Sequence, residues 1–228
     1  MGYNVSTWSF FSKYLDLDNC RGKRIMELGN QAIREPLREK LKIKHALSKP
    51  FFTERGYDHF SIDIIGGKDV LVKDLSSIID DESLVNSFDV VTNNGTSEHV
   101  EPYLSQYQCF ANIHNLVKKD GIMLHIVPEV GSYPNHCQIY YKKEFFRLLS
   151  SLNNYKILHL GRIKKAKDKN FVAAALKKTE DNVFVSPIAN FFKYVKFVPF
   201  IKKKNIHKKR ERDIAKARKL LKVLKNKI

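Results

Sequence analysis

Short apolar runs that end at turn residues alternate along this chain with longer segments of helical periodicity. Seven runs have the length and composition of strands: residues 24–28, 59–63, 69–72, 88–92, 122–127, 155–160 and 171–176. Helices are expected over the segment that holds Ala32, Leu37 and Leu41, over 103–117 and over 142–152. This alternation with short connections predicts an α/β fold, a doubly wound, mostly parallel, seven-stranded sheet with helices on both faces.

The positive charge is concentrated at the C-terminal end. The chain of 228 residues has a formal net charge of +17. Residues 193–228 hold 15 Lys and Arg against 2 acidic residues, whereas the preceding residues hold 26 against 22. The basicity therefore belongs to an appendage, and the length of the chain suits one domain. We expect a globular domain over residues 1–189 and a basic C-terminal extension over residues 190–228.

The cysteines and the apolar segments exclude several classes of protein. Cys20, Cys109 and Cys137 are odd in number and widely spaced, and they form no CxxC pair. This speaks against a disulfide scaffold and against a zinc site, so we expect no metal. Residues 1–16 lack the apolar core of a secretory signal, and no run approaches the roughly 18 apolar residues of a membrane span. A cytoplasmic location is the expectation.

Small and polar residues follow several of the predicted strands. They are Glu27, Gly29, Asn30, Asp63, Asp74, Asn93, Asn94 and Gly95, and the apolar Leu75 follows Asp74 directly. Ligands of open α/β sheets bind at the carboxyl ends of the strands, where a glycine such as Gly29 allows close approach. A carboxylate such as Asp63 can accept hydrogen bonds from both hydroxyls of a ribose, and Leu75 is placed to pack on an adenine ring. Each residue alone also fits a structural role, but their spacing at successive strand ends favours a cofactor site.

Five segments of the chain resemble the motifs of one family in the correct order. They are 22–29, 57–63, 88–100, 116–125 and 136–149, and they are similar to motifs of the class I S-adenosylmethionine-dependent methyltransferases. The resemblance covers about 22–176 and implies a Rossmann-like fold, S-adenosylmethionine as the cofactor and methyl transfer as the reaction. The first loop of that family has three glycines, whereas here Asn30 and Gln31 follow Gly29. A cofactor-free binding or assembly subunit is therefore the non-enzymatic alternative.

Histidines near the predicted strand ends offer proton-transfer chemistry. Methyl transfer from a sulfonium to a hydroxyl needs a group that takes the acceptor proton, and we expect an O-methyltransferase with a histidine base. His136 follows the long loop 128–135 and is the first candidate for that base, with His99 as the second. Substrate contacts are expected from Glu98, Glu129 and Tyr133. A loop histidine also fits a structural hydrogen bond, and His125, inside an apolar run, fits a core position.

The acceptor and the C-terminal extension leave several interpretations open. We expect a small molecule or a sugar as acceptor, such as a glycan precursor handled at the membrane. Residues 190–200 interleave aromatic side chains with lysines, and residues 214–228 predict a basic amphipathic helix. Such a helix suits an anionic surface at the inner membrane, or packing on its own body or on a second subunit in a homo-oligomer. An RNA or nucleotide methyltransferase that uses the extension for phosphate contacts is the other alternative, although nucleic acid fits the nearly neutral body less well.

Overall fold

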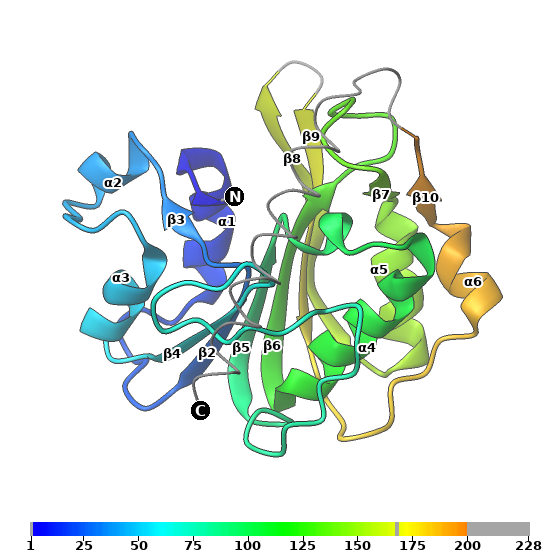
Figure 1. Cartoon of the computed structure of the whole chain (residues 1–228), viewed down its shortest axis with the longest axis horizontal. Helices are drawn as coiled ribbons and strands as arrows, with labels where there is room; N and C mark the ends of the chain where they lie inside the picture. The colour runs from blue at the N-terminus through cyan, green and yellow to red at the C-terminus, as the bar shows by residue number, and fades with distance from the viewer. Residues whose placement is uncertain (1, 167–168, 200–228) are drawn as a thin grey trace, which may run out of the picture.

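The computed structural model describes residues 2–166 and 169–199, and a six-stranded sheet forms its centre (Figure 1). The strands follow the order β4-β2-β5-β6-β9-β8. Their bounds are Arg24–Leu28 for β2, Asp58–Ile62 for β4, Phe88–Asn94 for β5, Val117–Pro128 for β6, Lys156–Ala166 for β8 and Lys169–Lys177 for β9. The first four are parallel, and β9 runs antiparallel to β6 and β8. The expected α/β class with a mostly parallel sheet is confirmed.

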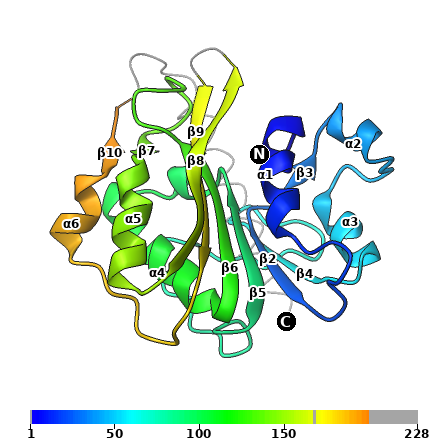
Figure 2. The same ribbon diagram turned by 180° about the vertical axis from the view of Figure 1, so that it is seen from behind.

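Helices cover both faces of this sheet (Figures 1 and 2). One face carries α1 and α3, which span Val5–Tyr14 and Ser48–Glu54, and the other carries α4 and α5, which span Gln106–Leu116 and Lys143–Leu152. Successive side chains of a strand point to opposite faces. In β5, Val90 accordingly packs in the core beneath α1 and α3, and Val91 packs in the core beneath α4 and α5. The strands are apolar on both faces because both faces are covered.

One of the seven predicted strands, 69–72, is reduced to a single parallel bridge between Ile62 and Leu71. The chain leaves the sheet edge on both sides of this bridge. Before it, Asp69 has a φ of 56°, a left-handed conformation that interrupts a strand. After it, the Asp74 carboxylate accepts a hydrogen bond from a backbone N–H two residues on, which starts a turn. Over the part of the chain that the structure describes, the central sheet therefore has six strands rather than seven.

The helix expected over 32–41 is also replaced. β3, Ala32–Ile33, pairs in parallel with β1, Gly2–Tyr3, and only the single turn of α2, Leu37–Lys40, is helical. The two short strands pack so closely that a Cβ on Gly2 would lie 2.3 Å from the Ala32 carbonyl oxygen. The extended conformation of 32–33 follows from this pairing with the N-terminal segment, which the local helical pattern does not encode.

The beginning of the predicted C-terminal extension packs on the body. The helix α6, Ile188–Lys193, leads into β10, Val195–Phe197, which pairs antiparallel with β7, Ile139–Tyr141. Phe191 and Val195 are completely buried in the core that α4 and α5 cover. Phe191 and the strand β10 of the expected extension therefore pack with the body, and residues 200–228 of that extension lie outside the described residues. The helix predicted over 214–228 lies outside the described residues, and among those described no helix combines the length and apolarity that a membrane span requires.

Val195→Ala tests this assignment of β10 to the body. Removing two methyl groups from a completely buried site costs their transfer free energy and leaves a cavity, so we expect the free energy of unfolding to fall by about 2 kcal/mol. Val183→Ala is the matched control, because Val183 is 83% exposed, and it should change stability by less than about 0.5 kcal/mol. Chemical denaturation of both variants measures the difference. Equal small effects would show that β10 contributes nothing to the core.

Candidate functional site

Three loops meet at the carboxyl ends of the parallel strands, around Gly29. Gly29 follows β2 with a φ of 82°, and its N–H donates to the Ile62 carbonyl oxygen at 2.7 Å. The Thr96 hydroxyl donates to the Leu28 carbonyl oxygen at 2.6 Å. A Cβ on residue 29 would lie 2.9 Å from this hydroxyl oxygen and 3.0 Å from the Gln31 amide nitrogen. Both the positive φ and the crowding require glycine here.

Asp63 joins two of these loops. It lies at the end of β4 and is partly exposed. Its Oδ2 accepts a hydrogen bond from the Asn30 N–H at 3.0 Å, and its Oδ1 accepts one from the Ile65 N–H at 2.9 Å. Each carboxylate oxygen has a second lone pair, so Asp63 can still accept two further hydrogen bonds. This geometry suits the two hydroxyls of a ribose, the role that Asp63 has in our prediction.

Glu27 lies beneath the loops and is completely buried. Its carboxylate accepts hydrogen bonds from the hydroxyls of Tyr3 and Ser48, and it lies 2.7 Å from His59 Nε2. Burial, together with the neighbouring charge of Glu27, raises the pKa of Tyr3 well above its ordinary value. Glu27 therefore joins the N-terminal segment, α3 and β4 to β2. This corrects the expectation that it contacts a cofactor, because the carboxylate is completely buried, unlike that of Asp63, and both of its oxygens have protein partners.

Asp74 and Leu75 do not join the loops around Gly29. The Asp74 carboxylate is exposed and accepts a hydrogen bond from the Ser76 N–H at 2.9 Å. Leu75 is buried in the core with Met26. A side chain that packs on an adenine ring needs an open face, and Leu75 has none. The expected adenine contact of Leu75 is therefore wrong, and Asp74 acts as the first residue of a turn.

Asn93 and Asn94 are the last residues of β5, and they differ in their contacts. Asn93 is completely buried, and its Oδ1 accepts a hydrogen bond from the Ser97 N–H at 3.1 Å while its Nδ2 donates to Ser97 Oγ at 2.8 Å. It therefore holds the following loop rather than a cofactor. Gly95 turns that loop with a φ of 73°. Asn94 is buried as well, and its Nδ2 has no hydrogen-bond partner among the described residues.

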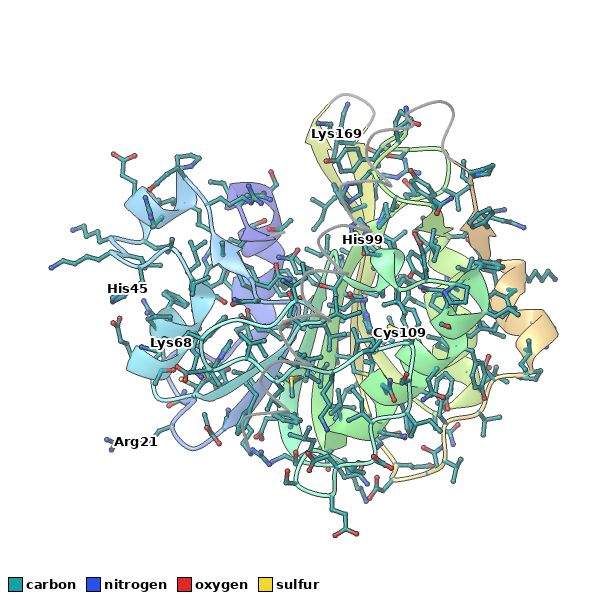
Figure 3. The ribbon with its side chains drawn as sticks, viewed as in Figure 1. Arg21, His45, Lys68, His99, Cys109 and Lys169 are labelled. Atoms are coloured by element: carbon teal, nitrogen blue, oxygen red, sulfur yellow. The ribbon has the colours of Figure 1, made fainter. Side chains whose placement is uncertain are left out.

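The structure brings Glu98, His99 and His136 together, and we refer to these three residues as the Glu98 cluster. Glu98 and His99 belong to the short 3-10 helix η1, Ser97–His99, and His136 comes from the loop after β6. Glu98 Oε1 lies 3.5 Å from His136 Nε2 and 3.9 Å from His99 Nε2. The two imidazole rings are 5.1 Å apart and nearly perpendicular. His99 lies beside the central strands, whereas His45 lies among the N-terminal elements (Figure 3).

Tyr133 extends the Glu98 cluster, and Glu129 does not. The Tyr133 ring stacks on the His136 imidazole with the centroids 4.1 Å apart and the planes 3° from parallel. Glu129 instead forms an ion pair with Arg162, with distances of 2.6 Å to Nε and 2.8 Å to a terminal guanidinium nitrogen. This carboxylate raises the pKa of Arg162. Glu129 therefore ties β8 to the loop after β6, which corrects its expected substrate contact.

His125 occupies a core position, as expected. It is buried in β6, its ring stacks on Phe110, and its Nδ1 lies 3.3 Å from the Asn93 amide nitrogen. Burial lowers the pKa of His125 to about 3. The imidazole is therefore neutral near pH 7 and serves packing.

Two residues that the sequence did not indicate hold η1 in place. Gln106 Nε2 donates to the carbonyl oxygens of Ser97 at 2.7 Å and Val100 at 2.8 Å. The Tyr141 hydroxyl donates to Gln106 Oε1 and lies 3.0 Å from Ser97 Oγ. Gln106 and Tyr141 are both completely buried. No local sequence pattern relates Tyr141 to η1, because Tyr141 follows Ser97 by 44 residues in the sequence.

Comparison with known proteins identifies the fold. No protein-family model matches this chain, and no curated protein matches its sequence. A Burkholderia thailandensis 1,6-didemethyltoxoflavin-N1-methyltransferase, solved with 1,6-didemethyltoxoflavin and S-adenosylhomocysteine, matches with a TM-score of 0.52 at 18% identity over 77% of each chain. An S-adenosylmethionine-dependent methyltransferase from Listeria monocytogenes has a TM-score of 0.51 at 10% identity, over 77% of this chain and 97% of that one.

A third structure agrees with these two. The Haemonchus contortus phosphoethanolamine N-methyltransferase 2, solved with phosphomonomethylethanolamine and S-adenosylhomocysteine, has a TM-score of 0.50 at 10% identity, over 76% of this chain and 52% of that one. At these identities the likeness is one of fold. The mostly parallel central sheet with helices on both faces agrees with it. The chain has the fold of the class I S-adenosylmethionine-dependent methyltransferases.

Proposed function

We propose that this chain transfers the methyl group of S-adenosylmethionine to a small-molecule acceptor. The observation that carries the proposal is the meeting of the Gly29 turn, Asp63 and the loop that leads to the Glu98 cluster at the carboxyl edge of the sheet. Thr96 bonds the Leu28 carbonyl beside the Gly29 turn and precedes Glu98 by two residues. Two of the similar structures contain S-adenosylhomocysteine with a small-molecule acceptor, which supports this choice of substrate class.

The residues around the Gly29 turn fit the cofactor. Asp63 offers acceptors for the ribose hydroxyls, and its Oδ2 also holds the Asn30 N–H in the turn that begins at Gly29. Gln31 stands where the family has a further glycine, but its amide nitrogen donates to the Leu28 carbonyl oxygen at 2.9 Å and its side chain is buried. It therefore does not project from the outer face of the loop. When bound, the cofactor supplies an electrophilic methyl group on a sulfonium sulfur.

We propose that the acceptor hydroxyl binds beside the Glu98 cluster. O-Methylation forms an oxygen–carbon bond, breaks the carbon–sulfur bond and releases the hydroxyl proton. His136 and His99 share Glu98 as a neighbour and contact each other, so we propose that they act on the hydroxyl as one unit rather than as a lone base. Tyr133, which stacks on His136, is the aromatic surface nearest to this position.

Titration with S-adenosylhomocysteine tests the cofactor part of the proposal. We expect calorimetry to show one site in the full chain, and Asp63→Ala to weaken binding by roughly 10- to 100-fold, because two charge-assisted hydrogen bonds are lost. Asp63→Asn keeps one side-chain oxygen, so its affinity for S-adenosylhomocysteine should lie between those of the wild type and Asp63→Ala. Asp74→Ala is the matched control and should bind like the wild type. Absence of binding in the wild type would overturn the proposed function, and undiminished binding by Asp63→Ala would remove the ribose role.

A further inference from the structure

We propose that Glu98, His99 and His136 bind a divalent transition-metal cation. The first observation is the state of Glu98, whose side chain is completely buried. Neither of its carboxylate oxygens accepts a hydrogen bond among the described residues. A buried carboxylate without hydrogen bonds is costly, and buried charges are normally paired or coordinate a metal. His136 Nε2, the nearest basic atom to Glu98 at 3.5 Å, is likewise buried without a hydrogen bond.

The three side chains point their ligand atoms at one another. One nitrogen of each histidine and one oxygen of Glu98 all lie within 4.8 Å of each other. Ligands about 2.0–2.2 Å from a metal lie roughly 3–3.5 Å apart around it. The distances of 3.5 Å and 3.9 Å from Glu98 Oε1 to the two imidazole nitrogens are close to that range. The two imidazole nitrogens lie within 4.8 Å of each other, so the ligand atoms have to come somewhat closer together around a bound cation.

The ligand types select the kind of cation. Two imidazole nitrogens and one carboxylate suit iron(II), zinc and similar first-row ions, whereas magnesium and calcium prefer oxygen ligands. Three protein ligands also leave coordination positions open, as in catalytic zinc sites. The cation would supply the positive charge that the buried Glu98 lacks. We therefore expect a transition metal with room for one exogenous oxygen.

Surrounding contacts hold the ligands in place. Asn93 and Gln106 bond the backbone of η1 at Ser97, directly before Glu98. Tyr133 stacks on the His136 ring and restricts its rotation. Preorganised ligands are typical of metal sites, because outer contacts fix the orientation of each ligand.

A cation here would activate the acceptor, and this step rests on the proposed methyl transfer. An acceptor hydroxyl bound to the cation loses its proton to solvent more easily, since a metal lowers the pKa of a coordinated oxygen. The resulting alkoxide attacks the methyl carbon, the carbon–sulfur bond breaks, and S-adenosylhomocysteine leaves as a neutral thioether. The histidines then act as ligands, and the proton is released to water.

Calorimetric titration of the full chain with zinc, after treatment with a chelator, tests the cation site without cofactor or acceptor. We expect one site that Glu98→Gln and His136→Ala each weaken at least about tenfold. His45→Ala is the matched control, because His45 forms an exposed pair with Glu54 at 3.4 Å, and it should bind zinc like the wild type. Magnesium should not compete. Glu98→Gln should fold, since the carboxylate that it replaces accepts no hydrogen bond among the described residues.

The outcomes separate the two proposals. Zinc binding that Glu98→Gln and His136→Ala leave unchanged would overturn the cation site and place the metal elsewhere. Zinc binding that depends on Glu98, in a chain that does not bind S-adenosylhomocysteine, would uphold the cation site and overturn the methyl transfer. A thermal shift with zinc gives a second measurement, because a ligand that binds only the folded state raises the melting temperature. This shift should be absent in Glu98→Gln.

Discussion

Glu27→Ala is expected to lower the free energy of unfolding by about 3–5 kcal/mol, because it leaves several buried groups without a partner. The hydroxyls of Tyr3 and Ser48 lose their acceptor, and His59 loses its carboxylate neighbour. These three residues belong to segments that are far apart in the sequence, so one side chain joins β1, α3 and β4 to β2. The loss should therefore appear as a lower stability of the whole domain. Chemical denaturation followed by circular dichroism measures it.

Two further variants make this result specific to the buried carboxylate. Glu27→Gln keeps one acceptor oxygen and should cause an intermediate loss. Glu54→Ala removes an exposed histidine–glutamate contact, between His45 and Glu54, so it should change stability by at most about 0.5 kcal/mol. A loss below about 1 kcal/mol in Glu27→Ala would show that the three partners find water or other acceptors. The structural role that we assign to Glu27 would then be wrong.

The central strands could be predicted because each is a short apolar run buried on both faces. The run 122–127 lies within β6, and the run 171–176 lies within β9. The short strands β1, β3 and β10 could not, because long-range pairing determines them. Local periodicity favoured a helix over 32–41, whereas pairing with Gly2–Tyr3 makes 32–33 extended. Tertiary contacts thus override local preference where an element is only two or three residues long.

The place of the candidate site residues in the fold was predictable, whereas their contacts were predictable only in part. The rule that ligands bind at carboxyl ends of parallel strands correctly brought Gly29, Asp63 and the Glu98 cluster to one edge. The ligand contacts predicted for Glu27 and Glu129 were wrong for a common reason, because each carboxylate is bonded to residues from distant segments. Glu27 contacts Tyr3, Ser48 and His59. Glu129 contacts Arg162. A sequence shows that a carboxylate ends a strand, but it does not show whether a protein group already occupies it.

The Glu98 cluster illustrates the opposite case. We expected no metal, because the three cysteines are widely spaced and form no CxxC pair. His136 is separated from His99 by the whole of α4 and β6. Only the fold places it against η1, where Glu98 is buried without a hydrogen bond among the described residues. Ligands from two separate loops are invisible to spacing rules, which detect metal sites only when their ligands are neighbours in the sequence.

His136→Ala is expected to lower the turnover of methyl transfer at least about 100-fold at saturating cofactor, with the affinity for S-adenosylhomocysteine unchanged. The reason is the position of His136, which belongs to the Glu98 cluster and not to the Gly29 turn or Asp63. Transfer of a labelled methyl group measures turnover once an acceptor is found, and His45→Ala should retain wild-type activity. Unchanged turnover in His136→Ala would remove this residue from the reaction.

The response of His136→Ala to added zinc then distinguishes a metal ligand from a general base. A variant that has lost one of three ligands binds the cation more weakly, so an excess of zinc should restore part of the turnover. A variant that has lost a base gains nothing from zinc, because no group has replaced the proton acceptor. Chelator treatment of the wild type provides the complementary measurement. It should abolish turnover if the cation activates the acceptor, and it should have no effect if His136 alone takes the proton.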